Sequence, residues 1–485
     1  MPQIIKELHP EIIRKTAARC KQLGITIPTF QQLRNPETLP PQITDRLQKV
    51  GLWDINPLNL YRITWKNDIR TGLFGGVNWL EIPPALSGIK ARIIGLVGRY
   101  FPTGAHKVGA AFGCLVPRLV SGAFDPEKHK AVWPSTGNYC RGGAFDCALL
   151  GCTAIAILPE EMSRERFEWL REIGAEVIAT PGCESNVKEI YDKCHELRQD
   201  PLNVILNQFE EFGNPIWHYS VTGPACDEVV EGLGNPALRP AAFISATGSA
   251  GTIAAGDYLK AHHPSLRVVA SEALQCPTLL MNGFGGHRIE GIGDKHIPWV
   301  HNVRNTDAVA AIDDEDCMRL LRLFNEPAGQ EYLAETGLEA ALIERLPLLG
   351  ISSIANLLAA VKTAKYFEFG EEDVILTIFT DSAEMYASRL SELAAERGFY
   401  RRDDALRDHA GPIAHQSIDY FKEVTYTDRK AIHHLKYYTW VEQQGKSSEE
   451  LNAQWDPEYW RALFEDEVGY FDELIGAFNA EIGRA

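Results

Sequence analysis

"PAAFISATGSAGTIAAG", residues Pro240 to Gly256, passes from an apolar run through six small residues into a second apolar run. The first run is typical of a strand that is buried on both faces. The second run predicts a helix over Gly251–His262. A buried strand, a small-residue turn and a helix form the repeating unit of an α/β fold with parallel sheets.

The turn inside this stretch has the chemistry of an anion site. Small side chains expose consecutive backbone N–H groups where a helix begins, and hydroxyl groups add further donors. A tight turn is the alternative, but it would not need six small residues. We therefore predict a phosphate-binding turn made of Thr247, Gly248, Ser249, Ala250, Gly251 and Thr252.

The same strand and helix alternation extends over residues 90–380. Short runs rich in Val, Ile, Leu and Ala predict the other buried strands: "RIIGLVG", "HKAVWPS", "CTAIAILP", "AEVIAT", "LNVIL", "LRVVASE" and "DVILTIF". The stretches between them predict the helices Asn138–Leu150, Ser163–Ile173, Glu184–Arg198, Pro215–Leu233 and Ser353–Phe369. In such sheets, ligands bind where strands turn into helix amino termini.

Composition narrows the class of protein. The 485 residues carry a net charge of −17 and no basic stripe, which argues against nucleic-acid binding. No run of eighteen uncharged apolar residues occurs, and the first twenty residues are charged throughout, so we expect neither a membrane span nor a signal peptide. None of the ten cysteines forms a C-x-x-C pair, so we expect buried, reduced thiols and no metal site. We expect a cytoplasmic protein.

Three further loops carry polar groups at predicted strand-to-helix junctions. "FPTGAHKVGAAF" (Phe101–Phe112) places Lys107 in a small, apolar run, where an amine needs either solvent or a partner. "WPSTGNYCRGG" offers hydroxyls and a carboxamide before a helix, as either an anion cradle or an ordinary N-cap. "ILTIFTDSAEMY" ends a buried strand at Thr380 and presents Asp381 and Ser382.

Together the four loops predict pyridoxal 5′-phosphate. This coenzyme needs an amine for its aldehyde, donors for its phosphate and a partner for its ring nitrogen. A dinucleotide would instead need a glycine fingerprint behind a first strand and an acidic ribose contact, and neither is evident.

The order of the motifs resembles the fold-type II pyridoxal-phosphate enzymes, and most closely the branch of cysteine synthase and cystathionine β-synthase. The likeness runs from "NPLNLYRI" at Asn56 to Ser388. "PTGAHK" resembles the lysine motif of that branch, and "STGN" resembles its substrate loop. "NQFEEFGNP" followed by "TGPACDEV" resembles the segment that comes next in these enzymes, and "ATGSAGT" takes the place of their phosphate loop. "HRIEGIGDKHIP", "LGISSIANLLAA" and "TDSAEMY" are similar to its later motifs.

The resemblance implies a role for each matched residue. Lys107 would form the Schiff base with the coenzyme, Asn138 would contact its 3′-oxygen, and His106 could donate to its phosphate. Ser382 would face the pyridine nitrogen, although Asp381 is one position away and stays open as the alternative. The substrate would contact Ser135, Thr136, Gly137, Asn138, Tyr139 and Gln208.

The expected architecture is α/β, with two parallel-sheet domains as in tryptophan synthase β-like enzymes. We divide the chain into an N-terminal extension (1–85), a domain with the lysine and the substrate loop (86–221), a domain with the phosphate loop (222–395) and a helical C-terminal extension (396–485). The last segment has no recognisable motif, and we expect it to pack on the catalytic body or on a second subunit. The family implies a homodimer.

The implied activity is β-replacement or β-elimination on a small amino acid such as serine, O-acetylserine or cysteine. Gln208 and the "TGP" segment favour chemistry like that of cysteine synthase. "GNYCRGG" is also similar to a motif of diaminopropionate ammonia-lyase, so ammonia elimination or dehydration of a hydroxyamino acid stays open. A coenzyme-binding protein without turnover is the third alternative, and the intact lysine, asparagine and phosphate loop speak against it.

Overall fold

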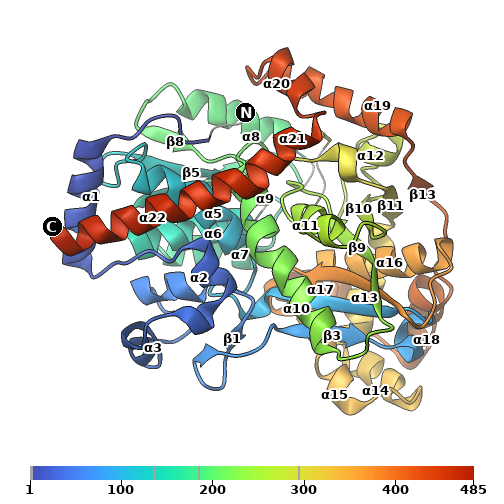
Figure 1. Ribbon diagram of the computed structural model, residues 1–485. Coiled ribbons are helices and arrows are strands. Elements are labelled where there is room, and N and C mark those ends of the chain that lie inside the picture. Colours follow the sequence, from blue (N-terminus) through green and yellow to red (C-terminus); the bar gives the residue numbers. More distant parts are fainter. Residues whose placement is uncertain (1–3, 136, 184–185, 293–294) are drawn as a thin grey trace.

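The computed structural model describes residues 4–135, 137–183, 186–292 and 295–485. Two sheets of different size form the body, and helices cover their faces (Figure 1). The N-terminal helices and the C-terminal helix lie side by side across the lobe that contains the smaller sheet (Figure 1). The α/β class with parallel sheets is confirmed.

The smaller sheet has four parallel strands in the order β7-β6-β5-β8. All four were predicted, because each carries a run of branched or small apolar residues; β5 and β6 are largely buried, whereas the edge strand β7 is only partly buried. The strands are β5 (Lys130–Pro134), β6 (Thr153–Pro159), β7 (Glu176–Thr180) and β8 (Asn203–Ile205), and the helices of this lobe are α5 (Lys107–Val120), α6 (Asn138–Leu150), α7 (Arg164–Glu172), α8 (Val187–Leu197) and α9 (Gly213–Trp217).

The larger sheet has seven strands in the order β13-β11-β10-β9-β12-β4-β3. The five inner strands are parallel, and the two edge strands run antiparallel to their neighbours. The strands are β3 (Trp79–Ile82), β4 (Arg92–Val97), β9 (Arg239–Ala246), β10 (Arg267–Ala273), β11 (Ala308–Ile312), β12 (Asp373–Phe379) and β13 (Phe421–Glu423). A short hairpin of β1 (Asn67–Asp68) and β2 (Leu73–Phe74) stands apart.

Strand β4 crosses the division that the sequence predicted. It lies in the range 86–221 assigned to the lysine domain, yet it pairs with β12 from Arg92 opposite Val374 to Val97 opposite Phe379. Strand pairing is decided by the tertiary fold, and no local pattern of the sequence indicates which strands lie beside β4. The division into four segments stays a proposal. Strands β3 and β4, which it assigns to its first and second segments, both lie in the larger sheet.

Most predicted helices are found within a few residues of the expected bounds. The predicted helix 215–233 is divided instead into α9, a π-helical turn (His218–Thr222) and α10 (Gly223–Gly232). The other helices of the body are α4 (Pro84–Ser87), α11 (Ala254–His262), α12 (Thr278–Met281), α13 (Asp314–Asn325), α14 (Pro327–Glu335), α15 (Ala340–Ile343), α16 (Ile351–Tyr366) and α17 (Ala387–Arg397).

The two extensions pack on the body and on each other. Asp472 of α22 (Glu467–Arg484) accepts the backbone N–H of Phe30 at 2.6 Å, and the Nδ2 of Asn479 donates to the carbonyl of Ile27 at 2.7 Å. The expected helical tail also supplies strand β13. The remaining helices of the extensions are α1 (Pro10–Leu23), α2 (Phe30–Arg34), α3 (Pro41–Leu47), α18 (Arg402–His409), α19 (Tyr426–Lys436), α20 (Ser448–Ala453) and α21 (Pro457–Arg461).

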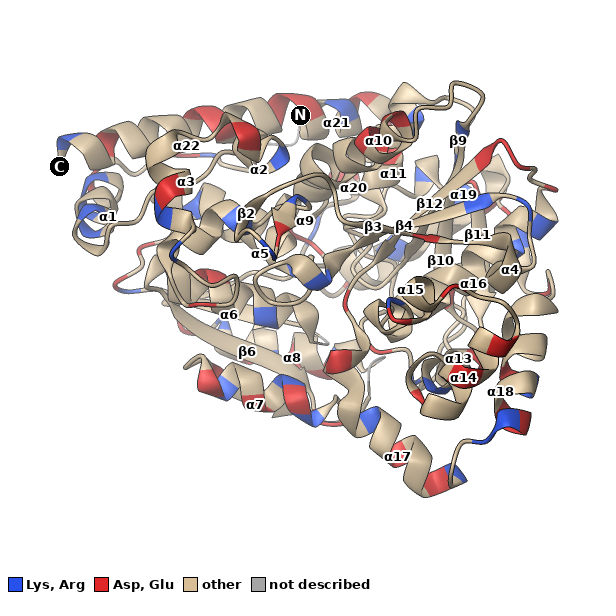
Figure 2. Ribbon diagram, turned by 90° about the horizontal axis from the view of Figure 1, so that it is seen from below, with Lys and Arg blue, Asp and Glu red and all other residues tan. Residues whose placement is uncertain are grey.

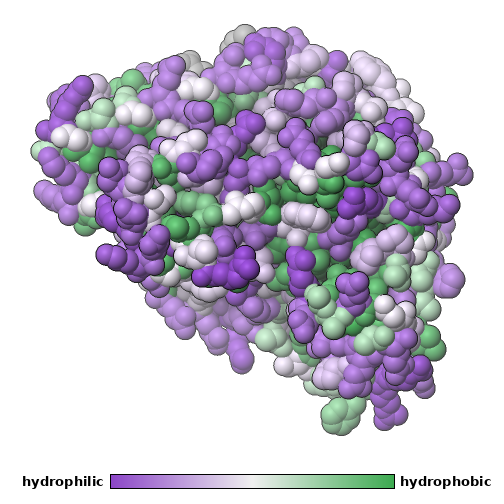
Figure 3. Space-filling view, turned by 60° about the horizontal axis from the view of Figure 1, so that its bottom comes forward, coloured by the Kyte–Doolittle hydropathy of each residue, from purple (hydrophilic) through white to green (hydrophobic). Residues whose placement is uncertain are grey.

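Acidic and basic residues are both found on many of the helices and loops in view, and Asp and Glu recur along α22 (Figure 2). Hydrophilic side chains cover most of the face in Figure 3, with hydrophobic ones gathered near its middle. Among the described residues, no single helix has the length and hydropathy to cross a membrane. One bent pair, Ala340–Leu348 with Ile351–Tyr366, meets that test only when its two parts are taken together.

A buried lysine anchors the C-terminal extension to the body. The Nζ of Lys436 is inaccessible to solvent and donates to the carbonyls of Trp299 and His301, at 2.9 and 2.7 Å, and to the Oε1 of Gln454 at 2.7 Å. The indole of Trp440 donates to the carbonyl of Ile297 at 2.8 Å. The extension thereby holds the segment 297–301, which follows closely on the residues Gly291 and Ile292.

We predict that Lys436→Met lowers the free energy of unfolding by about 1–3 kcal/mol, because the three buried acceptors lose their donor while the side-chain volume is kept. Urea unfolding followed by circular dichroism measures the change. Lys49→Met, at an exposed position of the N-terminal extension, is the control and should unfold like the wild type. An unchanged midpoint for Lys436→Met would contradict the anchoring role.

Candidate active site

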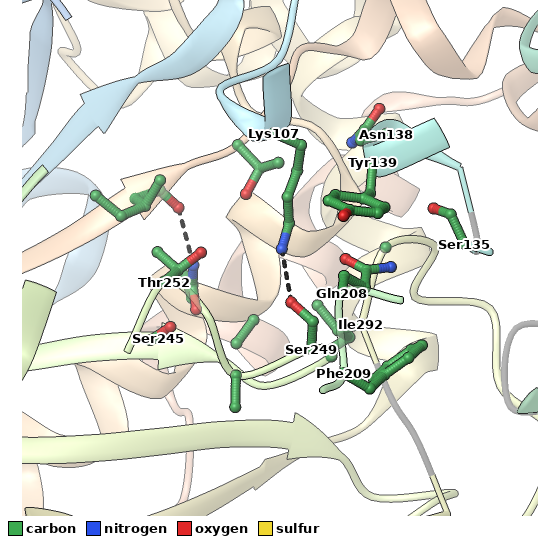
Figure 4. Close-up of a pocket in the computed structure, with 17 residues that line it drawn as sticks. Lys107, Ser135, Asn138, Tyr139, Gln208, Phe209, Ser245, Ser249, Thr252 and Ile292 are labelled. Carbon is green, nitrogen blue, oxygen red and sulfur yellow. Dashed lines mark hydrogen bonds between the residues drawn. The ribbon is translucent and has the colours of Figure 1, made fainter. Parts of the chain in front are cut away.

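A cavity lies where loops of the two sheets meet at the carboxyl ends of their strands (Figure 4). Its space, including the open mouth, is about 600 Å³. Loops that follow four strands contribute: β5 and β8 from the smaller sheet, β9 and β12 from the larger. The lining residues are Lys107, Ser135, Asn138, Tyr139, Gln208, Phe209, Ser245, Ala246, Gly248, Ser249, Ala250, Thr252, Gly291, Ile292, Asn356, Ile378 and Thr380.

Lys107 is the first residue of α5, and its side chain extends into this cavity (Figure 4). Its Nζ donates to the Oγ of Ser249 at 3.0 Å. Burial lowers the pKa of Lys107 to about 8, because desolvation penalises the charged ammonium. The amine that the sequence left without an evident partner therefore faces the predicted phosphate loop.

That loop joins β9 to α11 and forms a cup of small residues. Ala250 adopts a left-handed conformation at φ +56°, and a Cβ on Gly251 would lie 1.9 Å from the Oδ1 of Asn214, so the backbone passes where no larger residue fits. Within the described residues, no hydrogen bond ties the N–H groups of residues 248–252 to another protein group. These N–H groups suit an anion.

Five of the six predicted loop residues lie at the cavity or pack directly behind it, and the sixth does not. Gly248, Ser249, Ala250 and Thr252 line the cavity, and Gly251 packs against Asn214. Thr247 instead turns toward the sheet, where its Oγ1 donates to the carbonyl of Ser271 at 3.0 Å.

The predicted substrate loop forms the opposite wall. The Oγ of Ser135 accepts the N–H of Gly137 at 2.9 Å. Gly137 has φ +147°, and a Cβ there would lie 1.6 Å from the Nη1 of Arg166, so only glycine fits beside this guanidinium. Ser135 lines the cavity and Gly137 does not. Thr136 lies outside the described residues.

Asn138 lines the cavity and is held from behind by the larger sheet. Its Nδ2 donates to the Oδ2 of Asp381 at 2.6 Å, and the hydroxyl of Tyr386 donates to the same oxygen at 2.8 Å. The buried guanidinium of Arg166 donates to the Tyr386 hydroxyl at 2.9 Å. Burial raises the pKa of Asp381, while Arg166 and the two hydrogen bonds oppose that rise.

Tyr139 and Gln208 complete the wall that the sequence predicted. The hydroxyl of Tyr139 donates to the carbonyl of Leu206 at 3.1 Å, and its ring packs edge-on against Trp133. The carbonyl of Gln208 accepts the Nδ2 of Asn214 at 2.9 Å. Both side chains line the cavity (Figure 4), so the bulk of Tyr139 narrows the space beside Lys107.

His106 lies behind the phosphate loop. Its Nε2 is 3.3 Å from the Oγ1 of Thr252, and its ring stacks on Trp65. The Nε2 of His218 is 3.4 Å from the same hydroxyl. Burial lowers the pKa of His106 to about 3 and also lowers the pKa of His218 well below its ordinary value, so both rings are neutral at physiological pH. A contact of His106 with a bound phosphate would run through Thr252.

The strand end that follows β12 differs from the expectation. Thr380 lines the cavity, whereas the carboxylate of Asp381 accepts hydrogen bonds from Asn138 and Tyr386. Ser382 lines a different cavity. The sequence also overlooked Asn356, whose Nδ2 donates to the carbonyl of Ile378 at 2.8 Å, and Gly291–Ile292. These positions fall in the matched motifs "LGISSIANLLAA" and "HRIEGIGDKHIP", which could have marked them.

A family model described as "Pyridoxal-phosphate dependent enzyme" matches residues 99–381. This range holds Lys107, the substrate loop and the phosphate cup. The chain belongs to this family of pyridoxal-phosphate dependent enzymes. The resemblance that the sequence motifs indicated is confirmed.

Relatives of this pyridoxal-phosphate enzyme share the body but not the whole chain. A cysteine synthase of Staphylococcus aureus is 32% identical over 258 residues, which are 53% of this chain and 75% of that protein. An O-acetylserine dependent cystathionine β-synthase from Helicobacter pylori has a TM-score of 0.54 at 26% identity, over 65% of this chain and 95% of that one. A hydrogen sulfide-producing enzyme from Fusobacterium nucleatum has the same TM-score at 25% identity, over 64% and 97%.

The residues present fit the coenzyme of the family. An amine of lowered pKa suits an aldehyde, and the free N–H groups of residues 248–252 suit a phosphate beside it. Lys107 and Ser249 are already in hydrogen-bond contact, so the two functions meet at one end of the cavity.

The lowered pKa of Lys107 predicts how the protein free of coenzyme takes up pyridoxal phosphate. Only the neutral amine attacks an aldehyde, and its share rises with pH until the pKa is passed. The rate of covalent attachment at residue 107 should therefore rise up to about pH 8 and then level off. Stopped-flow absorbance between pH 6 and 10 measures this. A rate that keeps rising through pH 10 would show an ordinary lysine.

Proposed function

We propose that the protein catalyses β-replacement on a small amino acid of the serine or O-acetylserine type, with sulfide or a thiol as the incoming nucleophile. The observation that carries the proposal is the position of the Lys107 amine, in contact with the phosphate cup and facing the wall that holds Ser135 and Asn138. The relatives named as cysteine synthases support the reaction class.

The bound coenzyme supplies the electron withdrawal that makes the Cα proton of the substrate acidic. Lys107 takes that proton on its Nζ, and the leaving group departs from Cβ with the electrons of its bond. The nucleophile then forms a new bond at Cβ, and Lys107 returns the proton to Cα. A pKa of about 8 keeps a useful share of the amine neutral near physiological pH, as a base requires.

The opposite wall orients the substrate. Ser135 and Gln208 offer polar side chains to a carboxylate within the same cavity as Lys107. Asn138 is fixed by Asp381, and Asp381 is fixed in turn by Tyr386, so the carboxamide keeps one orientation. Holding the substrate in one pose aims its Cα–H bond at Lys107, which contributes much of the rate in such reactions.

β-Elimination, with release of sulfide from cysteine, is the second candidate. It needs the same proton transfer at Lys107 and differs in what reaches Cβ afterwards. The likeness to a hydrogen sulfide-producing enzyme supports this candidate. Within β-replacement, the bulk of Tyr139 beside the lysine favours a small nucleophile. As the family resemblance implies, we also propose a homodimer.

Two incubations of the purified enzyme separate the candidates. With O-acetylserine and sulfide, we expect cysteine, measured by chromatography after derivatisation. With cysteine alone, we expect at most slow formation of pyruvate and sulfide. Lys107→Ala, the matched control, should lose at least about a thousandfold of either activity, because the base is removed. Rapid pyruvate formation with no cysteine synthesis would replace the first candidate by the second, and wild-type rates in Lys107→Ala would refute both.

A further inference from the structure

A second cavity opens on the far side of the lysine loop and shares no lining residue with the active site. Its space, including the mouth, is about 550 Å³. It is bounded by Trp53 of the N-terminal extension, the turn Thr103–Gly104, Arg141 of α6 and Trp169 of α7. The segment 382–385, beyond the end of β12, closes it.

Arg141 supplies a buried positive charge to this cavity. Its residue exposure is 7%. Its Nη2 donates to the carbonyl of Thr103 at 3.0 Å, its Nη1 points at the sulfur of Met385, and its Nε has no hydrogen-bond partner. No carboxylate of the described residues lies within 4.0 Å of this guanidinium, whereas a buried charge ordinarily has a counter-ion.

The carboxylate of Asp381, an acidic group near Arg141, already has other partners. Asp381 binds Asn138 and Tyr386, and Arg166 lies 3.9 Å from the same carboxylate oxygen. Arg166 repels Arg141, and burial together with this repulsion lowers the pKa of Arg141 to about 10 in spite of Asp381. The guanidinium of Arg141 is thus short of negative charge on its cavity side.

Two further groups point to an anion at the same place. Ser382 is 2% exposed and lines the cavity, yet its Oγ has no hydrogen-bond partner. Arg99 stands at the rim, where its guanidinium lies over the ring of Trp53 and pairs at 2.7 Å with Glu384, a largely exposed side chain. Arg141 lies over Trp169 in the same way. Both guanidinium planes are therefore held in place by indole rings.

We propose that this cavity binds the oxyanion group of a small metabolite, a carboxylate or a phosphate, between Arg141, Ser382 and Arg99. The guanidinium of Arg141 provides the charge, the hydroxyl of Ser382 provides a donor, and Glu384 swings out to release Arg99. Arg141 lies three residues after Asn138 on α6 and holds the loop that leads to Lys107. An anion bound here would touch both elements from outside the active site.

Calorimetric titration of the coenzyme-loaded enzyme with sodium phosphate, and separately with sodium acetate, tests the proposal in a buffer of low ionic strength. We expect saturable binding of at least one ion, and the stronger of the two identifies the oxyanion. Arg141→Gln should weaken that binding at least about tenfold, because a charge-assisted hydrogen bond is lost. Arg99→Gln and Ser382→Ala should weaken it several-fold.

Two controls locate the bound ion. Ser135→Ala alters the substrate loop of the active site, and Arg70→Gln removes an exposed arginine; both should bind the ion as the wild type does. If Arg141→Gln does not fold, Arg99→Gln and Ser382→Ala decide. No saturable binding of either ion, or wild-type affinity in the cavity variants, would overturn the proposal. Because binding is measured without turnover, a failure of the proposed reaction would leave this result unaffected.

Discussion

The structure depends on one amine that is taken out of water and placed opposite a cup of backbone N–H groups. A lysine in that environment has a lowered pKa, and here desolvation brings the pKa of Lys107 to about 8. The same surroundings leave its Nζ in contact with Ser249 of the phosphate cup. One electrostatic arrangement thus prepares the lysine as a nucleophile toward the coenzyme and as a base toward the substrate.

The rest of the fold serves to bring two distant parts of the chain to that amine. The phosphate cup follows β9 of the larger sheet, and the substrate loop follows β5 of the smaller one. Asn138 of the substrate loop donates to Asp381, which follows β12 of the larger sheet, at 2.6 Å across 243 positions of sequence, and this hydrogen bond joins the loops of the two sheets. The backbone can approach Arg166 at Gly137 and Asn214 at Gly251 because glycine has no side chain. A Cβ at either position would clash with that neighbour.

Much of this was predictable from local sequence. The eight predicted strands are found because each is an apolar run of the right length, although β7 is only partly buried, and the phosphate cup is recognisable by its six small residues. The pairing of β4 with β12 was not predictable, since a partner 282 positions away leaves no local pattern. The turn after Phe379 decides that Thr380 lines the cavity and Ser382 does not, and the motif alone could not fix this.

Two features could be recognised only from the structure. Lys436 in the sequence is one more lysine of a charged helix, and only its three buried acceptors identify it as an anchor. Arg141 likewise looked like part of the substrate-loop motif. Its lack of a counter-ion is a property of the neighbours that the fold assembles from four separate segments. Such features depend on tertiary neighbours and carry no periodic signal.

The central claim is that the coenzyme is attached to one particular amine. Borohydride reduction of the coenzyme-loaded protein, followed by proteolysis and mass spectrometry of the peptides, tests it directly. The account predicts a single stable adduct, on the side chain of Lys107. An adduct on a different lysine, or a protein that takes up no pyridoxal phosphate, would contradict it.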